Sequence, residues 1–196
     1  MSWPAPVSLR RAEASVVPLE ARHAPDLARA SADGELHRLW YTSVPAPDDM
    51  ETAIAEFLVM QAAGTLTPFC VLDPDDTPVG ITTFCSPDAE NRRVEIGYTW
   101  YAARAQRSPL TTACKRLLLG HAFETLDCIA VEFCTHVLNT ASRRAIERLG
   151  AKLDGIRRAH RIMPNGTIRD TACYSITAPE WPVVRAHLDW QLERPR

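Results

Sequence analysis

The sequence predicts one mixed-sheet domain of the α/β or α+β class. With 196 residues, the chain is long enough for one well-buried domain and short for two. Its composition, 46% hydrophobic and 23% charged, is that of an ordinary globular protein. Strand-like runs alternate with amphipathic helical runs, in an order that requires both parallel and antiparallel strand pairs.

The N-terminal third is predicted to be mainly helical. Residues 14–30, "ASVVPLEARHAPDLARA", begin with a short strand and continue as a helix from about Ala24. A second helix is predicted over 48–63, with Asp48 as its N-cap and with Ile54, Phe57, Leu58 and Gln61 near one face. The segment between them, "YTSVPAPDD", contains two prolines and is expected to be irregular.

The middle of the chain changes to strand patterns. Residues 68–84, "PFCVLDPDDTPVGITTF", are two apolar runs around an acidic turn and predict a hairpin. The run "RRVEIGYTWY" at 92–101 alternates apolar and polar side chains, which predicts a further strand. A helix follows, because apolar residues recur at three- and four-residue intervals at Cys114, Leu117, Leu118, His121, Ala122 and Leu126.

The C-terminal part repeats this alternation. A strand is predicted over 128–137, and a helix over 139–151 with Asn139 as its cap and Gly150 at its end. Two strands flank the turn "PNG", and a final amphipathic helix carries Trp181, Val184, Leu188 and Leu192. The unit from 94 to 137 is predicted to be parallel and the hairpins antiparallel. No repeat or boundary divides the chain, so residues 1–196 are expected to form one domain.

Charge and cysteine spacing exclude several classes of partner. Lys and Arg number 22 against 24 Asp and Glu, so a net charge of −2 gives no reason to expect nucleic acid or a membrane surface. No apolar run approaches the ~20 residues of a membrane span, and "MSWPAPVSLRR" lacks the apolar core of a signal peptide. We therefore expect a cytoplasmic protein. The six cysteines show no C-x-x-C pair, which predicts buried reduced thiols and no metal.

The stretch "AQRSPLTTACK" at 105–115 is the first candidate for a binding site. The preceding strand ends near Tyr101, and a helix begins near Leu110 or Thr111. A helix N-terminus leaves four backbone N–H groups unpaired and carries partial positive charge, so it can bind a phosphate. The stretch lacks the glycines of a P-loop or dinucleotide turn, and an ordinary helix cap is the competing interpretation.

The run from Glu95 to Ser175 resembles the GNAT superfamily of N-acetyltransferases. The pieces that carry the resemblance are "VEIGYTWY", "QRSPLTTACKRLLLGHAFETL", "VEFCTHVLNTASRRAIERLGAKLDG" and "RIMPNGTIRDTACYSI". The most specific is "LNTASRRAIERLGA", which matches the family pattern N-x-x-S-R-x-x-x-E-K/R-L-G-F/A. The resemblance points to the RimJ/RimL-like branch, whose members acetylate the N-termini of ribosomal proteins.

This resemblance implies acetyl-coenzyme A as cosubstrate. In the family two central parallel strands splay apart and the pantetheine arm inserts between them, which here implies the strands "VEIGYTWY" and "AVEFCTHV". The implied coenzyme core is about 94–150, and the acceptor side is 24–65 with 155–178. The usual turn Q/R-x-x-G-x-G/A is replaced by glycine-free residues at 106–111, which implies altered phosphate contacts. The implied coenzyme-binding residues are Gln106, Arg107, Ser108, Leu110, Thr111, Thr112, Asn139 and Arg143.

The implied reaction is direct attack of a primary amine on the thioester in a ternary complex. The acceptor is a protein N-terminus, titrating near ~8, or a small-molecule amine; a lysine near ~10.4 would need more help from a base. The resemblance implies that Asn139 contacts the pantetheine and that Ser142 protonates the departing thiolate, while local helix-start roles compete for both residues. The general base is left open among Glu95, Glu132, His160 and water alone. Glu95 is favoured because its strand lines the splay.

Several alternatives accompany this interpretation. Cys114 is a covalent acceptor or, as we prefer, a core thiol. The basic cluster at Arg157, Arg158 and Arg161 meets an acidic substrate or a phosphate, or is a solvated strand edge. The chain as a whole is an enzyme, or a non-catalytic acyl-coenzyme A sensor, or an interaction protein that forms a homodimer through its C-terminal helix. Aromatic residues at 40 and 41 are expected to line the acceptor pocket.

Overall fold

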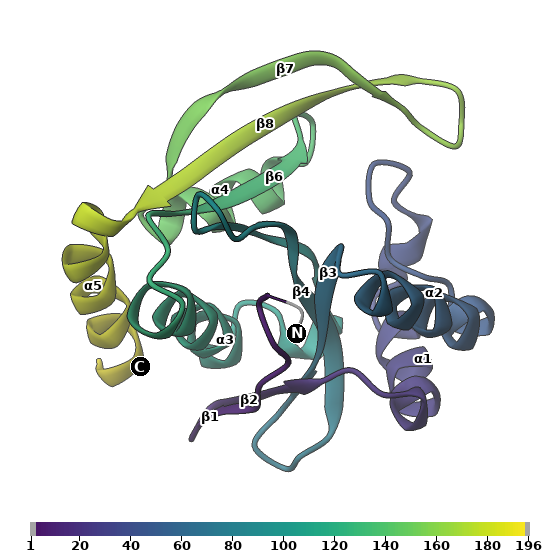
Figure 1. Cartoon of the computed structure of the whole chain (residues 1–196). Helices are drawn as coiled ribbons and strands as arrows, with labels where there is room; N and C mark the ends of the chain where they lie inside the picture. Colours follow the sequence, from purple (N-terminus) through teal and green to yellow (C-terminus); the bar gives the residue numbers. More distant parts are fainter. Residues whose placement is uncertain (1–2, 195–196) are drawn as a thin grey trace.

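An eight-stranded mixed sheet is the framework of the computed structural model, which describes residues 3–194 (Figure 1). The strand order is β1-β2-β3-β4-β5-β6-β8-β7. Every neighbouring pair is antiparallel except β5 and β6, which are parallel. The predicted fold class, the antiparallel hairpins and the parallel unit are therefore confirmed. In the described part of the chain, every helix is too short or too polar to cross a membrane.

The order of elements also follows the prediction. The first half contains β1 (Leu9–Arg11), β2 (Ala14–Pro18), α1 (Ala24–Ala32), α2 (Met50–Ala62), β3 (Leu66–Leu72), β4 (Pro78–Asp88) and β5 (Arg93–Tyr101). The second half contains α3 (Pro109–Gly120), β6 (Ala130–His136), α4 (Thr140–Arg148), β7 (Lys152–Ile162), β8 (Ile168–Thr177) and α5 (Trp181–Glu193).

Three local predictions were incomplete or wrong. Strand β1 was missed because its three residues, "LRR", carry no alternation of apolar and polar side chains. The helix after residue 108 does not stay regular to its end, since a π-helical turn over His121–Thr125 follows α3. Asp48 does not cap α2: it lies in a 3₁₀ turn over Pro47–Asp49, and α2 begins after that turn without a side-chain cap.

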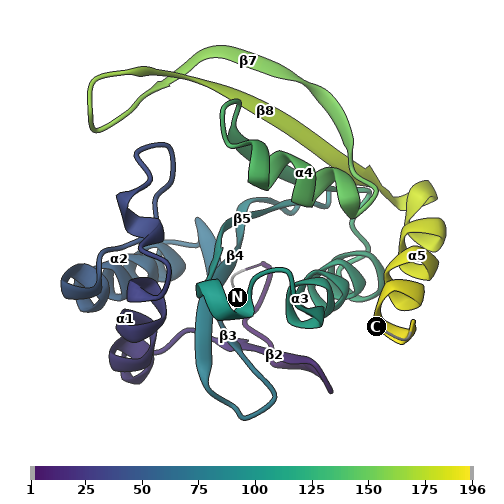
Figure 2. The ribbon, with the colours of Figure 1, turned by 180° about the vertical axis from the view of Figure 1, so that it is seen from behind.

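Helices cover both faces of the N-terminal strands. Helices α1 and α2 pack on β4 and β3, while α3 packs on β1 and β2 from the opposite side, with α5 behind it (Figures 1 and 2). The apolar residues between these layers form one continuous core, whose largest fully buried side chains include Leu27, Phe69, Ile81, Phe84, Leu118 and Leu188.

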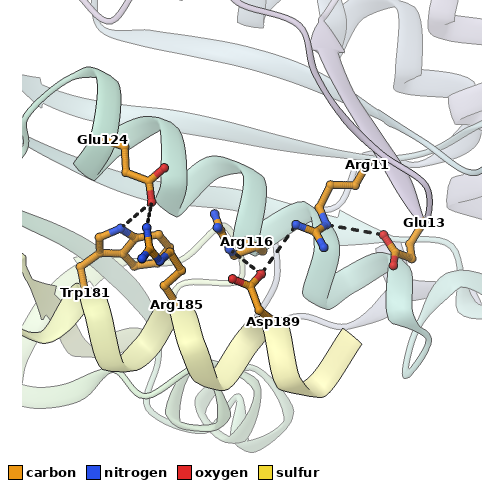
Figure 3. A network of polar contacts seen from close by, with 7 residues as sticks. All are labelled: Arg11, Glu13, Arg116, Glu124, Trp181, Arg185 and Asp189. Atoms are coloured by element: carbon orange, nitrogen blue, oxygen red, sulfur yellow. Dashed lines mark hydrogen bonds and ion pairs between the residues drawn. The ribbon is translucent and has the colours of Figure 1, made fainter. Parts of the chain in front are cut away.

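Polar contacts tie α5 to the back of α3 (Figure 3). Asp189 accepts a hydrogen bond from Arg116 Nε at 2.9 Å and forms an ion pair of 3.6 Å with Arg11. Glu124 accepts hydrogen bonds from the indole of Trp181 and from Arg185, at 3.0 and 3.3 Å. The buried face of α5 is therefore occupied within the same chain, and α3 is held from behind.

The sheet opens between β5 and β6. Their pairing covers only Arg93–Glu95 of β5 and Ala130–Glu132 of β6, although both strands continue beyond it. A bulge on the other edge of β5 places Tyr98 and Thr99 opposite Thr82 alone, and Tyr98 has a positive φ of 49°. A bulge of this kind bends its strand and ends regular pairing, so β5 leaves β6 after three rungs.

Candidate active site

The splay between β5 and β6 contains a cavity of about 660 Å³. Its walls come from both strands, from the first turns of α3 and α4, and from the segment that joins α1 to α2. The lining includes Gly97, Tyr98, Thr99, Trp100, Tyr101, Phe133, Cys134, Thr135, His136, Lys115, Tyr41 and Arg169. The two parallel strands implied by the resemblance are therefore the strands that diverge here.

The start of α3 has no side-chain cap within residues 3–194. Its N-cap, Ser108, makes no side-chain cap among the described residues, because the hydroxyl donates instead to the carbonyl of Ala105 at 2.6 Å. The first backbone N–H groups of the helix are thus left available for a ligand. Arg107 before it has a positive φ of 57°, a conformation in which glycine is favoured.

The predicted coenzyme-binding residues at this helix start separate into two groups. Gln106, Arg107 and Thr111 line the cavity. The side chains of Leu110 and Thr112 are buried in the core, and that of Ser108 is engaged with Ala105, so these three do not form the lining. Any contact from Leu110 or Thr112 to a ligand would have to come from the backbone.

Helix α4 contributes Asn139 and Ser142 to the same cavity. The Asn139 side chain caps the helix by accepting a hydrogen bond from the Ser142 backbone N–H at 3.0 Å, which confirms the predicted cap. The Ser142 hydroxyl has no hydrogen-bond partner among residues 3–194, so the competing backbone-bonding role is not filled. Arg143 turns away: its Nε donates to the Tyr174 hydroxyl at 2.8 Å, and it does not line the cavity.

Glu95 lies at the point where the strands separate. It occupies the last paired rung, opposite Glu132, and the next residue on its side of β5 is Gly97 of the cavity wall. A Cβ on Gly97 would lie 3.2 Å from Glu95 Oε1 and 2.6 Å from the Cys85 sulfur, so the carboxylate occupies space that only glycine leaves free. Burial raises the pKa of Glu95, and the charge of Glu132 raises it further.

The other candidate bases are engaged elsewhere. Glu132 forms an ion pair with Arg93. His160 Nδ1 lies 3.0 Å from the Thr171 hydroxyl. None of the three candidates, Glu95, Glu132 and His160, is among the lining residues, so Glu95 is distinguished by its free carboxylate next to Gly97 of the cavity wall. Cys114 is fully buried in the core, and burial raises the pKa of its thiol, as expected of a structural cysteine.

Several cavity residues were not identified from the sequence, and Lys115, His136 and Arg169 are three of them. Lys115 reaches the wall from the second turn of α3 and donates to the Thr99 hydroxyl at 2.9 Å, while burial lowers its pKa to about 8. His136 and Arg169 come from β6 and β8. Lys115 lies beside the apolar stripe of its helix, but the sequence does not indicate that its side chain reaches a cavity.

The aromatic prediction for residues 40 and 41 was half right. Tyr41 lines the cavity, and Trp40 does not. Trp40 packs edge-on against Tyr41 and His136, with ring centroids 5.6 and 5.3 Å apart. Within residues 3–194 no group of three or more His, Cys, Asp or Glu side chains is arranged to hold a metal ion.

Comparison with known proteins is consistent with this geometry. Residues 15–152 match the family model described as Acetyltransferase (GNAT) domain. The chain is 35% identical over 107 residues to the "Putative ribosomal N-acetyltransferase YdaF" of Bacillus subtilis (strain 168), a stretch covering 55% of this chain and 57% of that protein. The chain thus matches little more than half the length of this relative.

Solved structures extend the similarity to the whole fold. A GCN5-related N-acetyltransferase from Brucella melitensis superposes with a TM-score of 0.84 at 26% identity, covering 96% of this chain and 86% of that one. Mycobacterium smegmatis RimJ in complex with CoA-disulfide gives a TM-score of 0.79 at 22% identity, covering 97% of both chains, which is a likeness of fold. With the family model matching most of the chain and the sheet opening where the resemblance implies, this chain belongs to the GNAT acetyltransferases.

Proposed function

We propose that this chain transfers the acetyl group of acetyl-coenzyme A to a primary amine, and that the amine is the α-amino group of a protein N-terminus. The observation that carries the proposal is the three-rung pairing of β5 and β6. Glu95 occupies the last rung, and the cavity begins at the next residues of β5, Ile96 and Gly97. The name of the Bacillus relative, a ribosomal N-acetyltransferase, supports the choice of acceptor.

The residues present fit coenzyme A. The uncapped start of α3 offers backbone N–H groups and the partial positive charge of the helix to a pyrophosphate, with Arg107 and Gln106 beside it. The cavity continues from this point along both diverging strands, whose unpaired backbone groups suit the amides of a pantetheine arm. Asn139 and Ser142 line the same cavity. No glycine is required in the turn, because Arg107 itself adopts the positive φ.

Acetyl-coenzyme A supplies an acyl thioester, and residues of the chain accept and donate the protons that the transfer requires. Glu95 accepts a proton from the ammonium of the acceptor, directly or through one water, and its raised pKa brings it closer to that of the amine. Ser142, whose hydroxyl is otherwise unengaged in the described chain, donates a proton to the departing sulfur. An α-amino group titrates near ~8, so a single weak base suffices to give the free amine.

Ligand binding is the first test. Coenzyme A at a hundredfold excess over its Kd should stabilise the protein by about 2.7 kcal/mol in a thermal melt. Release of free thiol from acetyl-coenzyme A, measured with a peptide panel, then separates an enzyme from a sensor. Two peptides of the panel should differ in sequence at one internal position only. One has a free N-terminus and no lysine, and the other has a blocked N-terminus and one lysine at that position.

The expected result is turnover of the first peptide and not the second. A melting temperature unmoved by millimolar coenzyme A would overturn the family-based activity itself. Binding without turnover of any amine would leave the sensor alternative in its place.

A further inference from the structure

Four arginines on the β7–β8 hairpin are not in ion-pair contact with a carboxylate of the described chain, although the charges of Arg161, Arg157 and Arg169 act on Glu95 and oppose the rise in its pKa that burial causes. Arg157, Arg158, Arg161 and Arg169 form no ion pair with any carboxylate among residues 3–194. Arg161 and Arg169 stand directly opposite one another across the two strands. Like charges directly opposite one another destabilise a sheet. A bound anion would offset the repulsion between these two guanidinium groups.

One ring nitrogen of the nearby His136 also lacks a hydrogen-bond partner within residues 3–194. Its Nδ1 accepts a hydrogen bond from the Leu138 backbone N–H at 3.1 Å, so the proton of the neutral ring lies on Nε2. Nε2 is buried with no partner in the described chain, and the residue is only 3% exposed. Burial lowers the pKa of His136, and the charge of Arg169 lowers it further, so the ring is a neutral donor.

Both donors border the cavity. His136 and Arg169 line it together with Tyr41. The half-buried guanidinium of Arg169 donates through Nε to Thr171 at 3.0 Å, which orients the group and leaves its remaining N–H groups free for a ligand. Thr171 is paired with His136 across β8 and β6, so the two donors are close neighbours on the sheet. A site made of donors alone selects an acceptor-only group such as a carboxylate.

The face of the sheet indicates which substrate this group belongs to. Tyr174 of β8 bonds α4 through Arg143 and Glu147, so alternation puts Arg169, two positions before Thr171, on the opposite face. Glu95 lies on that same opposite face, because Val94 and Ile96 point into the core. The helix start proposed for the coenzyme phosphates lies on the other face, with α3 and α4. The cluster therefore faces the acceptor amine.

We propose that Arg169 and His136, reinforced by Arg161, form a subsite for a carboxylate carried by the acyl acceptor. This inference rests on the proposed acetyl transfer. The carboxylate comes from an acidic side chain near the N-terminus of a peptide or from the α-carboxylate of a free amino acid, and both present the same two oxygens. It is held while the amine of the same molecule meets Glu95.

A matched substrate set tests the subsite. Three peptides with amidated C-termini differ only at the second position, as Ser-Asp, Ser-Asn and Ser-Lys, and free serine supplies an α-carboxylate alone. We expect kcat/KM for Ser-Asp to exceed that for Ser-Asn by about tenfold or more, the effect of one charge-assisted hydrogen bond. Ser-Asp above serine assigns the carboxylate to a peptide side chain; the reverse order assigns it to an amino acid.

Charge reversal supplies the matched variants. Arg169→Glu should lose the preference for Ser-Asp and favour Ser-Lys. Arg158→Glu changes the net charge equally, but Arg158 does not line the cavity. It lines a second, open depression that shares only His136 with the cavity, so this variant should keep the wild-type order. Arg169→Gln serves if the glutamate variant does not fold, and should make Ser-Asp and Ser-Asn equal. His136→Phe keeps the aromatic contacts and should reduce the preference.

Equal rates for Ser-Asp and Ser-Asn in the wild type would overturn the subsite, as would identical effects of the two charge reversals. If no amine is acetylated, the proposed transfer fails, and binding of the N-acetylated Ser-Asp and Ser-Asn peptides in the presence of coenzyme A decides the subsite by calorimetry. A tighter Ser-Asp product that depends on Arg169 supports it, and equal affinities reject it.

Discussion

Glu95 and Glu132 face each other in the last rung that joins β5 to β6. Glu132 forms an ion pair with Arg93, whereas Glu95 has no hydrogen-bond partner for its carboxylate within residues 3–194. Two carboxyl groups in adjacent positions cannot both ionise without cost, and burial adds to that cost. The resulting rise in the pKa of Glu95 has effects on both rate and stability.

Glu95→Gln should lower kcat/KM by about 10²–10⁴-fold. It should remove the part of the pH profile in which kcat/KM rises as the Glu95 carboxyl group ionises. It should also raise the melting temperature at pH 8. Because the folded-state pKa lies above the ordinary 4.5, ionisation of Glu95 costs stability. The cost is absent below the ordinary value, grows as pH rises from there to the folded-state value, and is full above it. The gain should therefore vanish at pH 4. Pre-steady-state rates and thermal melts at both pH values measure the two effects.

The control for this variant is Glu132→Gln, which removes the neighbouring charge and keeps Glu95. Its rising limb should move to lower pH while kcat at the plateau is retained. An unaltered pH profile in Glu95→Gln would transfer the base role to His160, Glu132 or water.

Ser142→Ala should be a partial lesion. A thiol titrates near ~8.5, so some thiolate leaves without protonation, and we expect a loss of about 10²-fold in kcat. The KM for acetyl-coenzyme A should change little, since the hydroxyl acts on the departing sulfur. Steady-state kinetics with the α-amine peptide measure both. A KM that rises as kcat is preserved would make Ser142 a binding residue.

Asn139 has two separable functions. Asn139→Ala removes the helix cap and should cost about 1 kcal/mol in the free energy of unfolding, with a raised KM for acetyl-coenzyme A. Asn139→Ser keeps a capping oxygen and removes the amide. The serine variant should therefore have the wild-type free energy of unfolding but still show a raised KM for acetyl-coenzyme A. Recovery of both in urea titrations and kinetics would reduce Asn139 to a cap.

Arg107 combines a charge with a strained backbone. Arg107→Ala should weaken coenzyme A by about 1–3 kcal/mol, the effect of losing a charged hydrogen bond. Arg107→Gly should weaken it similarly while stabilising the free protein, because glycine adopts a φ of 57° without strain. Calorimetry compares both with Arg144→Ala, an exposed arginine of α4 outside the cavity lining. Affinities equal to the wild type would make the turn a cap alone.

Lys115 carries a charge at the cavity wall that the fold disfavours. Its folded-state pKa of about 8 lies below the ordinary 10.5, so the penalty is full below pH 8 and disappears above 10.5. Lys115→Met should stabilise the free protein at pH 7 by on the order of 3 kcal/mol. Guanidinium titrations from pH 7 to 10.5 should show the gain shrinking. A gain independent of pH would assign it to packing.

The local parts of this structure were predictable from sequence. The pattern "NTASRRAIERLG" contains its own cap and its own glycine end, so Asn139 and Gly150 could be placed without tertiary information. The divergence of β5 and β6 followed from the family resemblance, and the helix start at Ser108 followed from its polar residues.

The assembled parts were not predictable. His136 and Arg169 are 33 positions apart and meet only because β6 pairs with β8. Lys115 falls beside the apolar stripe of α3 and acquires its position from the bulge that brings Thr99 within 2.9 Å. Strand order and a two-residue bulge decide these contacts, and neither leaves a periodic signal in the sequence.

The three rungs between β5 and β6 are the one strand pairing within residues 3–194 that joins β1–β5 to the half-sheet of β6, β8 and β7. Few hydrogen bonds must break for the two halves to separate locally, so this seam opens at a lower free energy than the long ladders of β3 with β4 or β7 with β8. In deuterated water, the amide hydrogens of Arg93–Tyr101 facing β6 should exchange early. A ligand bound between β5 and β6 would slow this exchange. The local separation of the two strands in the free protein is therefore the same motion that admits the ligand.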